Sequence, residues 1–203
     1  ANLITTAGAD RVMTVDLHAA QVQGFFDVPL DNLYAEPILS RHFAEGRLEN
    51  LVLVSPDVGN AKRAGQYARR LGGDLAIIHK RRISGSEAEA GRMIGDVDGK
   101  TVLMVDDMIT TAGTICAAAE MARQRGATRI LAGATHAVLC RPAIERLREA
   151  AIDEIVVTDT LPVPEETKQA LPMMTVLTIS QLIGEAIHRI HNNESVSSLF
   201  LTG

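Results

Sequence analysis

One stretch of this sequence, from Val102 to Thr114, combines the residue types that could bind a sugar phosphate. Four apolar residues lead into the adjacent carboxylates Asp106 and Asp107, and a loop rich in hydroxyl groups precedes a helical pattern. Carboxylates accept hydrogen bonds from sugar hydroxyls, while backbone N–H groups at a helix start favour a phosphate. The loop residues are Thr110, Thr111, Ala112, Gly113 and Thr114. The plain alternative is an ordinary strand-to-helix turn with aspartate capping.

Two further polar segments could serve the same ligand. The turn from Ser55 to Gly59 could present backbone N–H groups to a pyrophosphate, although its Asp57 could equally cap the following helix. His18 taken alone is typical of a hydrogen-bonded structural histidine. Beside Asp57 it could hold a metal–nucleotide complex, with the reservation that Mg²⁺ favours oxygen ligands.

A basic run, Lys80-Arg81-Arg82, follows an apolar segment directly. Such a run is usually a solvated face. Here it enters a stretch with little hydrophobic periodicity, so it could instead move over a polyphosphate and neutralise charge in a transition state.

Composition excludes several classes of protein. The 203 residues are 46% hydrophobic and carry a net charge of −5, which predicts a packed core without a basic field for nucleic acid or anionic membrane. Aromatic residues make up only 3%, so stacking on single-stranded nucleic acid is not expected. No apolar run has the length of a membrane-spanning helix. Cys116 and Cys140 are expected to be buried free thiols, and we expect a cytoplasmic location.

The order of the predicted elements indicates the α/β class. Short apolar runs predict strands over Arg11–Asp16, Asn50–Val54, Asp74–His79, Thr101–Val105, Arg129–Thr135, Glu154–Thr158 and Thr175–Ile179. Helical patterns cover Pro37–Ala44, Ala61–Leu71, Thr114–Arg125, Pro142–Ala150 and Ser180–His191, and Ala1–Thr6 resembles the end of a helix. This alternation predicts a parallel sheet with helices on both faces.

The predicted sheet brings the polar segments together. In open α/β sheets, ligands bind outside the carboxyl ends of the strands. His18, Asp57, the basic run and the Asp106–Asp107 pair each follow one of the first four predicted strands, so we expect them to converge. The segment from Arg81 to Gly99 is expected to be a mobile surface loop.

Taken together, these segments resemble the ribose-phosphate pyrophosphokinases, also called phosphoribosyl pyrophosphate synthetases. The matching stretches are Thr14–Ala19, Ser55–Gly59, Lys80–Arg82, Gly95–Lys100, Val105–Thr114 and Glu194–Phe200. The resemblance implies a type I phosphoribosyltransferase-like fold. It implies Mg²⁺-dependent transfer of the diphosphoryl group of ATP to the anomeric hydroxyl of ribose 5-phosphate, which gives phosphoribosyl pyrophosphate and AMP.

The resemblance also implies roles for the site residues. The ribose 5-phosphate site would consist of Asp106, Asp107, Thr110, Thr111, Ala112, Gly113 and Thr114. The nucleotide and pyrophosphate site would consist of His18, Asp57, Val58 and Gly59. Mg²⁺ would be held by His18, Asp57, Asp106 and Asp107. Lys80 and Arg82 would stabilise the migrating group, with the sugar hydroxyl as nucleophile.

The chain departs from the family pattern at three positions. Asn60 stands where a second glycine is usual, Thr110 where aspartate is frequent, and the pair Cys140-Arg141 where Ser-Gly is common.

Family members also carry a further N-terminal segment. The resemblance therefore predicts that residues 1–31 are the end of a first phosphoribosyltransferase-like domain, 32–175 a complete second one, and 176–203 a helix and tail that pack back on the first. It predicts a homo-oligomer and, for this chain, a truncated form with little or no activity. The alternatives are a non-catalytic subunit associated with the synthetase and a base-salvage phosphoribosyltransferase.

Overall fold

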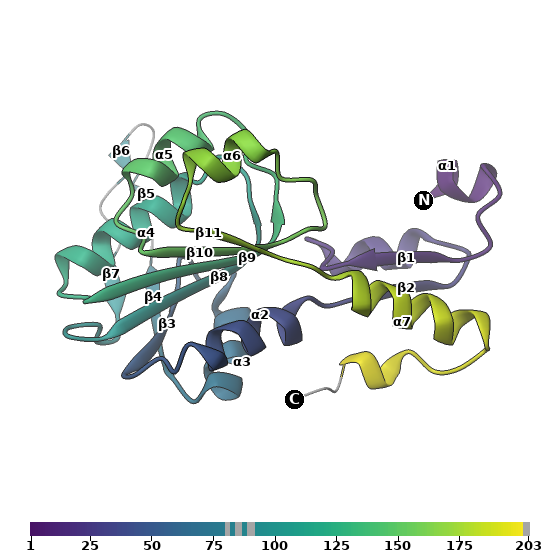
Figure 1. The fold of residues 1–203 in the computed structure, drawn as a ribbon, viewed down its shortest axis with the longest axis horizontal. Coiled ribbons are helices and arrows are strands. Elements are labelled where there is room, and N and C mark those ends of the chain that lie inside the picture. Colours follow the sequence, from purple (N-terminus) through teal and green to yellow (C-terminus); the bar gives the residue numbers. More distant parts are fainter. Residues whose placement is uncertain (80–81, 84–86, 89–91, 201–203) are drawn as a thin grey trace.

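The chain folds into a large seven-stranded sheet with helices on both faces and a smaller lobe beside it (Figure 1). It is described by a computed structural model that covers residues 1–79, 82–83, 87–88 and 92–200. The strand order in the large sheet is β11-β10-β9-β8-β3-β4-β7, and every pairing is parallel except that of β7 with β4. These findings confirm the α/β class and the helix-covered parallel sheet.

The strands of the large sheet are β3 (Leu51–Ser55), β4 (Asp74–His79), β7 (Arg92–Ile94), β8 (Thr101–Ile109), β9 (Arg129–Ala137), β10 (Glu154–Thr158) and β11 (Met174–Leu177). The helices around it are α2 (Glu36–Glu45), α3 (Ala61–Leu71), α4 (Gly113–Gln124), α5 (Ala143–Glu149) and α6 (Glu165–Ala170). A short two-stranded sheet is formed by β5 (Arg82–Ile83) and β6 (Glu87–Ala88).

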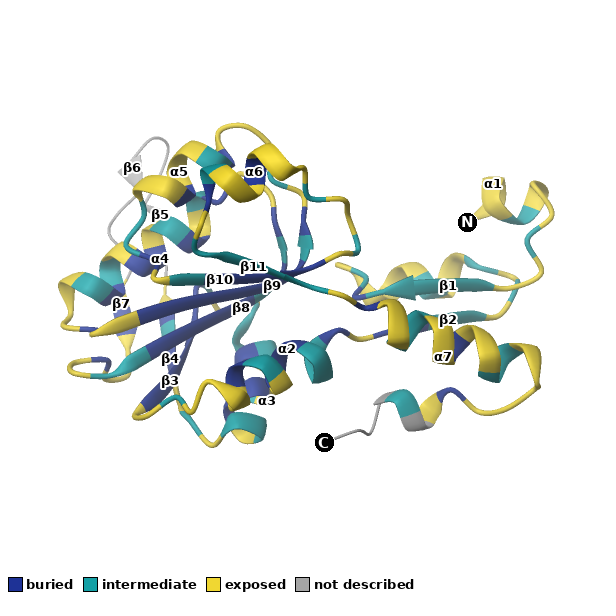
Figure 2. Cartoon of the chain, viewed as in Figure 1, coloured by how far each residue is buried: buried dark blue, intermediate teal, exposed yellow. Residues whose placement is uncertain are grey.

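Alternation along the central strands produces two separate apolar cores. Leu51, Leu53, Leu103 and Val105 pack with residues of α2 and α3, whereas their neighbours Val52, Val54, Val102 and Met104 pack with α4 and α5. Successive side chains of a strand point to opposite faces, so both faces of a buried strand must be apolar. Figure 2 shows this burial concentrated in the large sheet.

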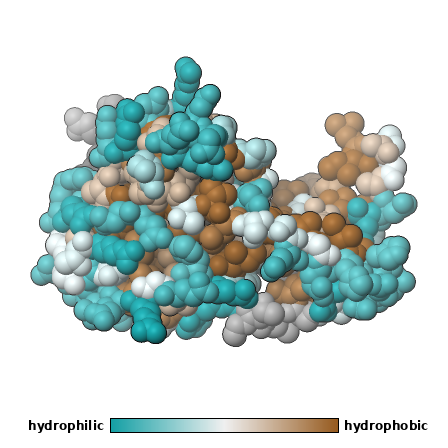
Figure 3. All heavy atoms as spheres, in the orientation of Figure 1, coloured by the Kyte–Doolittle hydropathy of each residue, from teal (hydrophilic) through white to brown (hydrophobic). Residues whose placement is uncertain are grey.

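The smaller lobe contains α1 (Asn2–Thr6), β1 (Val12–Val15), β2 (Leu30–Leu33), α7 (Ser180–His191) and two 3₁₀ turns, Ala20–Phe25 and Ser197–Phe200. β1 lies outside the large sheet, unlike in a single sheet through all the predicted strands, and among the described residues it pairs with β2 alone, in parallel. The sequence analysis missed β2, since its polar Asp31 and Asn32 are atypical of a strand. Apolar surface gathers where this lobe meets the large sheet (Figure 3).

The expectation of a mobile surface loop from Arg81 to Gly99 is wrong for its last part, residues 92–97. The strand β7 extends the sheet antiparallel to β4, and Met93 and Val97 are buried. Gly95, with φ +113°, makes this packing possible, because a Cβ at this position would lie 2.6 Å from Ala76 Cβ. The region's few apolar residues are too sparse for a periodic signal.

Both cysteines are free, as expected, but neither is buried: Cys116 is partly exposed and Cys140 is exposed. Within the described residues, no helix combines the length and apolarity needed to cross a membrane. The predicted division at residues 31/32 and 175/176 falls inside β2 and β11. It stays a prediction.

Candidate functional site

The sheet topology opens a crevice between β3 and β8. From β3 the chain continues through α3 on one face, and from β8 through α4 on the other, so the loops after these two strands diverge. Such a topological switch point is where open α/β sheets bind ligands. β8 pairs with β3 only as far as Leu103 but with β9 as far as Ile109. The edge of β8 that faces β3 is therefore open beside Asp106.

Asp106 and Asp107 lie within β8 rather than in a turn after it, because the strand continues to Ile109 and not only to Val105. Pairing with β9 outweighs the low strand propensity of aspartate here. The backbone N–H of Asp107 donates to Asp106 Oδ1 at 2.9 Å, and that of Met108 donates to Asp107 Oδ1 at 3.0 Å. Both carboxylates are thus held by the backbone of their own strand.

The two carboxylates differ in their protonation. Burial and the neighbouring Asp107 raise the pKa of Asp106 to about 6. Burial acts to raise the pKa of Asp107 as well, but hydrogen bonds with Asp106 and His18 and the charge of Arg63 outweigh it and lower that pKa. Asp107 is therefore the member of the pair that stays ionised, while Asp106 takes up a proton as the pH falls through about 6.

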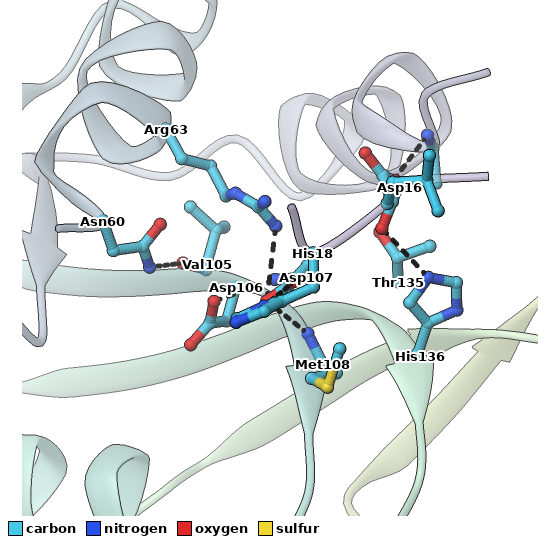
Figure 4. Close-up of polar contacts among 12 residues, drawn as sticks. Asp16, His18, Asn60, Arg63, Val105, Asp106, Asp107, Met108, Thr135 and His136 are labelled. Carbon is cyan, nitrogen blue, oxygen red and sulfur yellow. Dashed lines mark hydrogen bonds and ion pairs between the residues drawn. The ribbon is translucent and has the colours of Figure 1, made fainter. Parts of the chain in front are cut away.

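His18 reaches this pair from the smaller lobe. Its Nδ1 donates to Asp107 Oδ2 at 2.6 Å, while the His18 side chain is 75% exposed and that of Asp107 only 4% (Figure 4). The expected proximity of His18 to the acidic pair is present, although β1 belongs to another sheet.

The turn after β3 is closed by its own side chains. The Ser55 hydroxyl donates to the carbonyl of Asp57 at 2.6 Å, and Asp57 Oδ1 accepts the backbone N–H of Asn60 at 2.9 Å. The second contact closes the turn but does not cap α3, because Asn60 is the N-cap residue of that helix and the cap makes no side-chain hydrogen bond. Asn60 Nδ2 in turn donates to the carbonyl of Val105 at 2.6 Å. This side chain ties the turn to β8 one residue before Asp106.

Arg63 supplies a positive charge that the sequence analysis did not identify. It projects from α3 toward β8, and its Nη1 lies 3.9 Å from Asp107 Oδ1 (Figure 4). A single basic residue on an amphipathic helix carries no pattern that separates it from solvated neighbours.

These residues line a cavity of about 560 Å³. Its walls are His18, Asp57, Gly59, Asn60, Arg63, Asp106, Asp107, Met108 and Thr110. A cavity of this size with a few polar groups that converge is typical of a small-molecule site. Val58, which was expected in the nucleotide site, is exposed and does not line it.

The loop after β8 forms a second, smaller hollow of about 130 Å³ at the start of α4. It is lined by Asp57, Asp106 and the residues 108–115, so it adjoins the larger cavity. Ala112 adopts φ +59° at the N-cap of α4, and its side chain makes no capping hydrogen bond. The first N–H groups of the helix are thereby available to an anion. Arg146 of α5 braces the loop, with Nη1 donating to the carbonyl of Thr111 at 3.0 Å.

Two expected residues cannot be placed in this site. Lys80 lies outside the described residues, and of Arg82 only the backbone is described, in β5. Within the described part of the chain, no three carboxylate, histidine or cysteine side chains are placed to enclose a metal ion. The cavity is instead lined by Asp106 and Asp107 from β8 and by Asp57 from the turn after β3.

Comparison with known proteins identifies a matching family and several similar proteins. A family model described as "Phosphoribosyl synthetase-associated domain" matches residues 83–201. The chain is 55% identical over 203 residues to a ribose-phosphate pyrophosphokinase of Rhodopirellula baltica, covering 98% of this chain and 64% of the relative. It is 51% identical over 202 residues to the enzyme of that name from Synechococcus elongatus, covering 98% of this chain and 60% of the relative.

A solved structure of a protein with this activity in its name also resembles the chain. The phosphoribosylpyrophosphate synthetase from Mycobacterium smegmatis superposes with a TM-score of 0.87 at 42% identity, covering 95% of this chain and 62% of that one. The chain therefore spans less than two thirds of the length of these proteins.

Proposed function

The chain belongs to the ribose-phosphate pyrophosphokinase family, and from that premise we propose that it carries the ribose 5-phosphate site of a phosphoribosyl pyrophosphate synthetase. The reaction would transfer the diphosphoryl group of ATP to the anomeric hydroxyl of the sugar, with AMP as the other product. The observation that carries the proposal is the adjoining pair of hollows, one rich in carboxylates and one at a helix N-terminus, which share Asp57, Asp106, Met108 and Thr110.

The chemistry of each hollow indicates which part of the substrates it would bind. The 5-phosphate, a dianion, would occupy the loop formed by Thr110, Thr111, Ala112, Gly113 and Thr114, where helix N–H groups and hydroxyls can donate to it. The ribose hydroxyls would donate to the carboxylates of Asp106 and Asp107. The diphosphoryl group would lie toward Asp57, Gly59 and His18, on the other side of the larger cavity.

Positioning would do most of the catalytic work. The anomeric oxygen attacks the β-phosphorus of ATP, the bond from that phosphorus to the α-phosphate oxygen breaks, and AMP leaves with the electron pair. Phosphoryl transfer of this kind asks a protein mainly for alignment and for neutralisation of charge. We propose that Lys80 and Arg82 neutralise the charge on the transferred group, and that His18 helps to hold the nucleotide.

The carboxylates fit Mg²⁺. This ion prefers oxygen ligands and usually binds through one or two carboxylates together with substrate phosphates, which agrees with an open acidic wall rather than a closed cage. The adjacent Asp106 and Asp107 are the residues that would hold it together with substrate phosphates, while Asp57 and His18, the other two ligands that the resemblance implies, line the same cavity. When bound, Mg²⁺ would neutralise phosphate charge and orient the sugar hydroxyls.

Calorimetric titration of the chain with ribose 5-phosphate, and separately with Mg–ATP, tests the proposal. We expect the wild-type chain to bind ribose 5-phosphate and to bind Mg–ATP more weakly than ribose 5-phosphate. Asp107→Ala should lose the binding of ribose 5-phosphate. Because the chain spans only part of its relatives, turnover and self-association into a homo-oligomer are proposed for the whole protein. Binding of neither ligand would contradict the proposal and favour a non-catalytic subunit.

A further inference from the structure

We infer that Asp16, a residue outside the proposed ligand-binding groups, is a positioning residue that sets the place of His18 against Asp107. The inference depends on the proposed function only for what His18 does, because the contacts themselves are those of the ligand-free chain.

Asp16 stands where the smaller lobe joins the large sheet. Its side chain is buried, with 8% exposure, and its Oδ2 accepts two hydrogen bonds. One comes from the backbone N–H of Ala35 at 2.9 Å and the other from the hydroxyl of Thr135 at 2.6 Å. Ala35 precedes α2 and Thr135 lies in β9, so one carboxylate oxygen links the end of β1 to two elements packed in the large core.

The backbone around Asp16 is held as firmly as its side chain. Its N–H donates to the carbonyl of Leu33 at 2.9 Å, and its φ of +45° lies in the left-handed region, which aspartate and asparagine tolerate better than most residues. His136, next to Thr135, donates from Nε2 to the carbonyl of Val15 at 3.0 Å. The end of β1 is thus bonded to β9 at two successive residues.

The position of His18 depends on these hydrogen bonds at the end of β1. It follows Asp16 by two residues, its side chain is largely exposed, and its ring bonds to Asp107 across the gap between the two sheets. β1 and β2 share no ladder with the seven-stranded sheet in the described residues, so the sheets themselves do not set this distance. Figure 4 shows both contacts in one view: Asp16 points toward Thr135, and His18 lies against Asp107.

The chemistry of the anchor predicts which substitutions keep it. Asparagine retains an acceptor oxygen and tolerates positive φ, so Asp16→Asn should preserve the link. Alanine offers no acceptor and leaves the buried Ala35 N–H and Thr135 hydroxyl without this partner, so Asp16→Ala should loosen the end of β1, which keeps its backbone bonds to Leu33 and His136.

The test follows the His18 ring in the ligand-free protein by ¹H–¹³C NMR. The spectrum of Asp107→Ala, in which His18 has lost its side-chain acceptor, supplies the reference position of the released ring. We expect Asp16→Ala to move the His18 cross-peak to that reference position and Asp16→Asn to leave it at the wild-type position. Asp153→Ala is the matched control, because Asp153 Oδ2 likewise accepts a backbone N–H, that of Ile130 at 2.6 Å, but at the opposite end of β9 from Thr135.

A purely structural role would lower the unfolding temperature in Asp16→Ala without moving the His18 cross-peak to the reference, and this result would overturn the inference. If Asp16→Ala does not fold, Thr135→Val removes one of the two donors and should shift the peak part of the way; an unmoved peak there would also overturn it. If the wild-type chain does not bind ribose 5-phosphate, the proposed function is contradicted, but the result on the ligand-free His18 ring is unaffected.

Discussion

The side-chain amide of Asn60 donates to the carbonyl of Val105 at 2.6 Å, which joins the turn after β3 to the strand that carries the acidic pair. The two residues are neighbours only because β3 and β8 are adjacent in the sheet. This contact holds the places proposed for the diphosphoryl group and for the sugar at a set separation.

Asn60→Ala should weaken this join. We expect the free energy of unfolding to fall by about 1 kcal/mol, the usual net value of one hydrogen bond, and the affinity for ribose 5-phosphate to fall severalfold. Urea titration and calorimetry measure the two effects. Gln66→Ala, on the exposed face of α3, the helix that begins directly after Asn60, is the control. Equal loss of stability in the two variants would contradict a specific role for the Asn60 amide.

The carboxylate of Asp106 should make the protein less stable at high pH than a neutral side chain at this position would. Its folded pKa of about 6 exceeds the unfolded value of 3.8, so the folded state binds the proton more tightly. The resulting stability is present below pH 3.8 and is lost as the pH rises through 6. Asp106→Asn should therefore raise the free energy of unfolding at pH 8, by roughly 1–3 kcal/mol.

Chemical denaturation of the wild type and of Asp106→Asn at pH 8, 6 and 4 measures this difference, which should shrink as the pH falls. An asparagine variant that is less stable than the wild type at pH 8 would show that the buried carboxylate is compensated in the folded chain.

Arg146 should matter to the phosphate loop although it lies outside the cavity. Its hydrogen bond to the carbonyl of Thr111 holds the loop against α5. We expect Arg146→Ala to weaken ribose 5-phosphate binding about threefold to tenfold, as loss of one hydrogen bond would. Arg148→Ala, which removes the same charge from the same helix, should leave the affinity unchanged. Calorimetry distinguishes loop bracing from a general effect of charge.

Lys80 should carry much of the transition-state charge. We expect Lys80→Ala to lower the rate of AMP formation at least about a hundredfold in the active protein, because electrostatic groups of this kind commonly contribute that much. Lys168→Ala, on α6, should have no such effect. Normal turnover in Lys80→Ala would refute the role proposed for it.

Much of the large sheet could be predicted from local pattern. The runs that became β3, β8, β9 and β10 are apolar and short, and the helices α3 and α4 between strands repeat apolar residues at helical spacing. The polar residues that end these strands could be assigned to one edge, because parallel strands share their direction.

The prediction was weaker where local pattern and tertiary contact disagree. Asp106 and Asp107 lie in a strand against their propensity, since β9 supplies hydrogen-bond partners as far as Ile109. The strand β7 was missed for the same reason, because its short stretch becomes a strand only beside β4. Asn60 was noted only as a departure from the family pattern and Arg63 was not noted at all, as nothing in their local sequence marks them as neighbours of β8.

The sequence by itself determined the class of the fold, the acidic pair and the helix-start loop, because these depend on residues that are close along the chain. Only the tertiary structure decided that β1 belongs to a separate sheet and that Asp16 bonds Thr135, a residue 119 positions away. Contacts of this kind arise when packed elements bring distant backbone and side-chain groups into hydrogen-bond range, and no local periodicity encodes them.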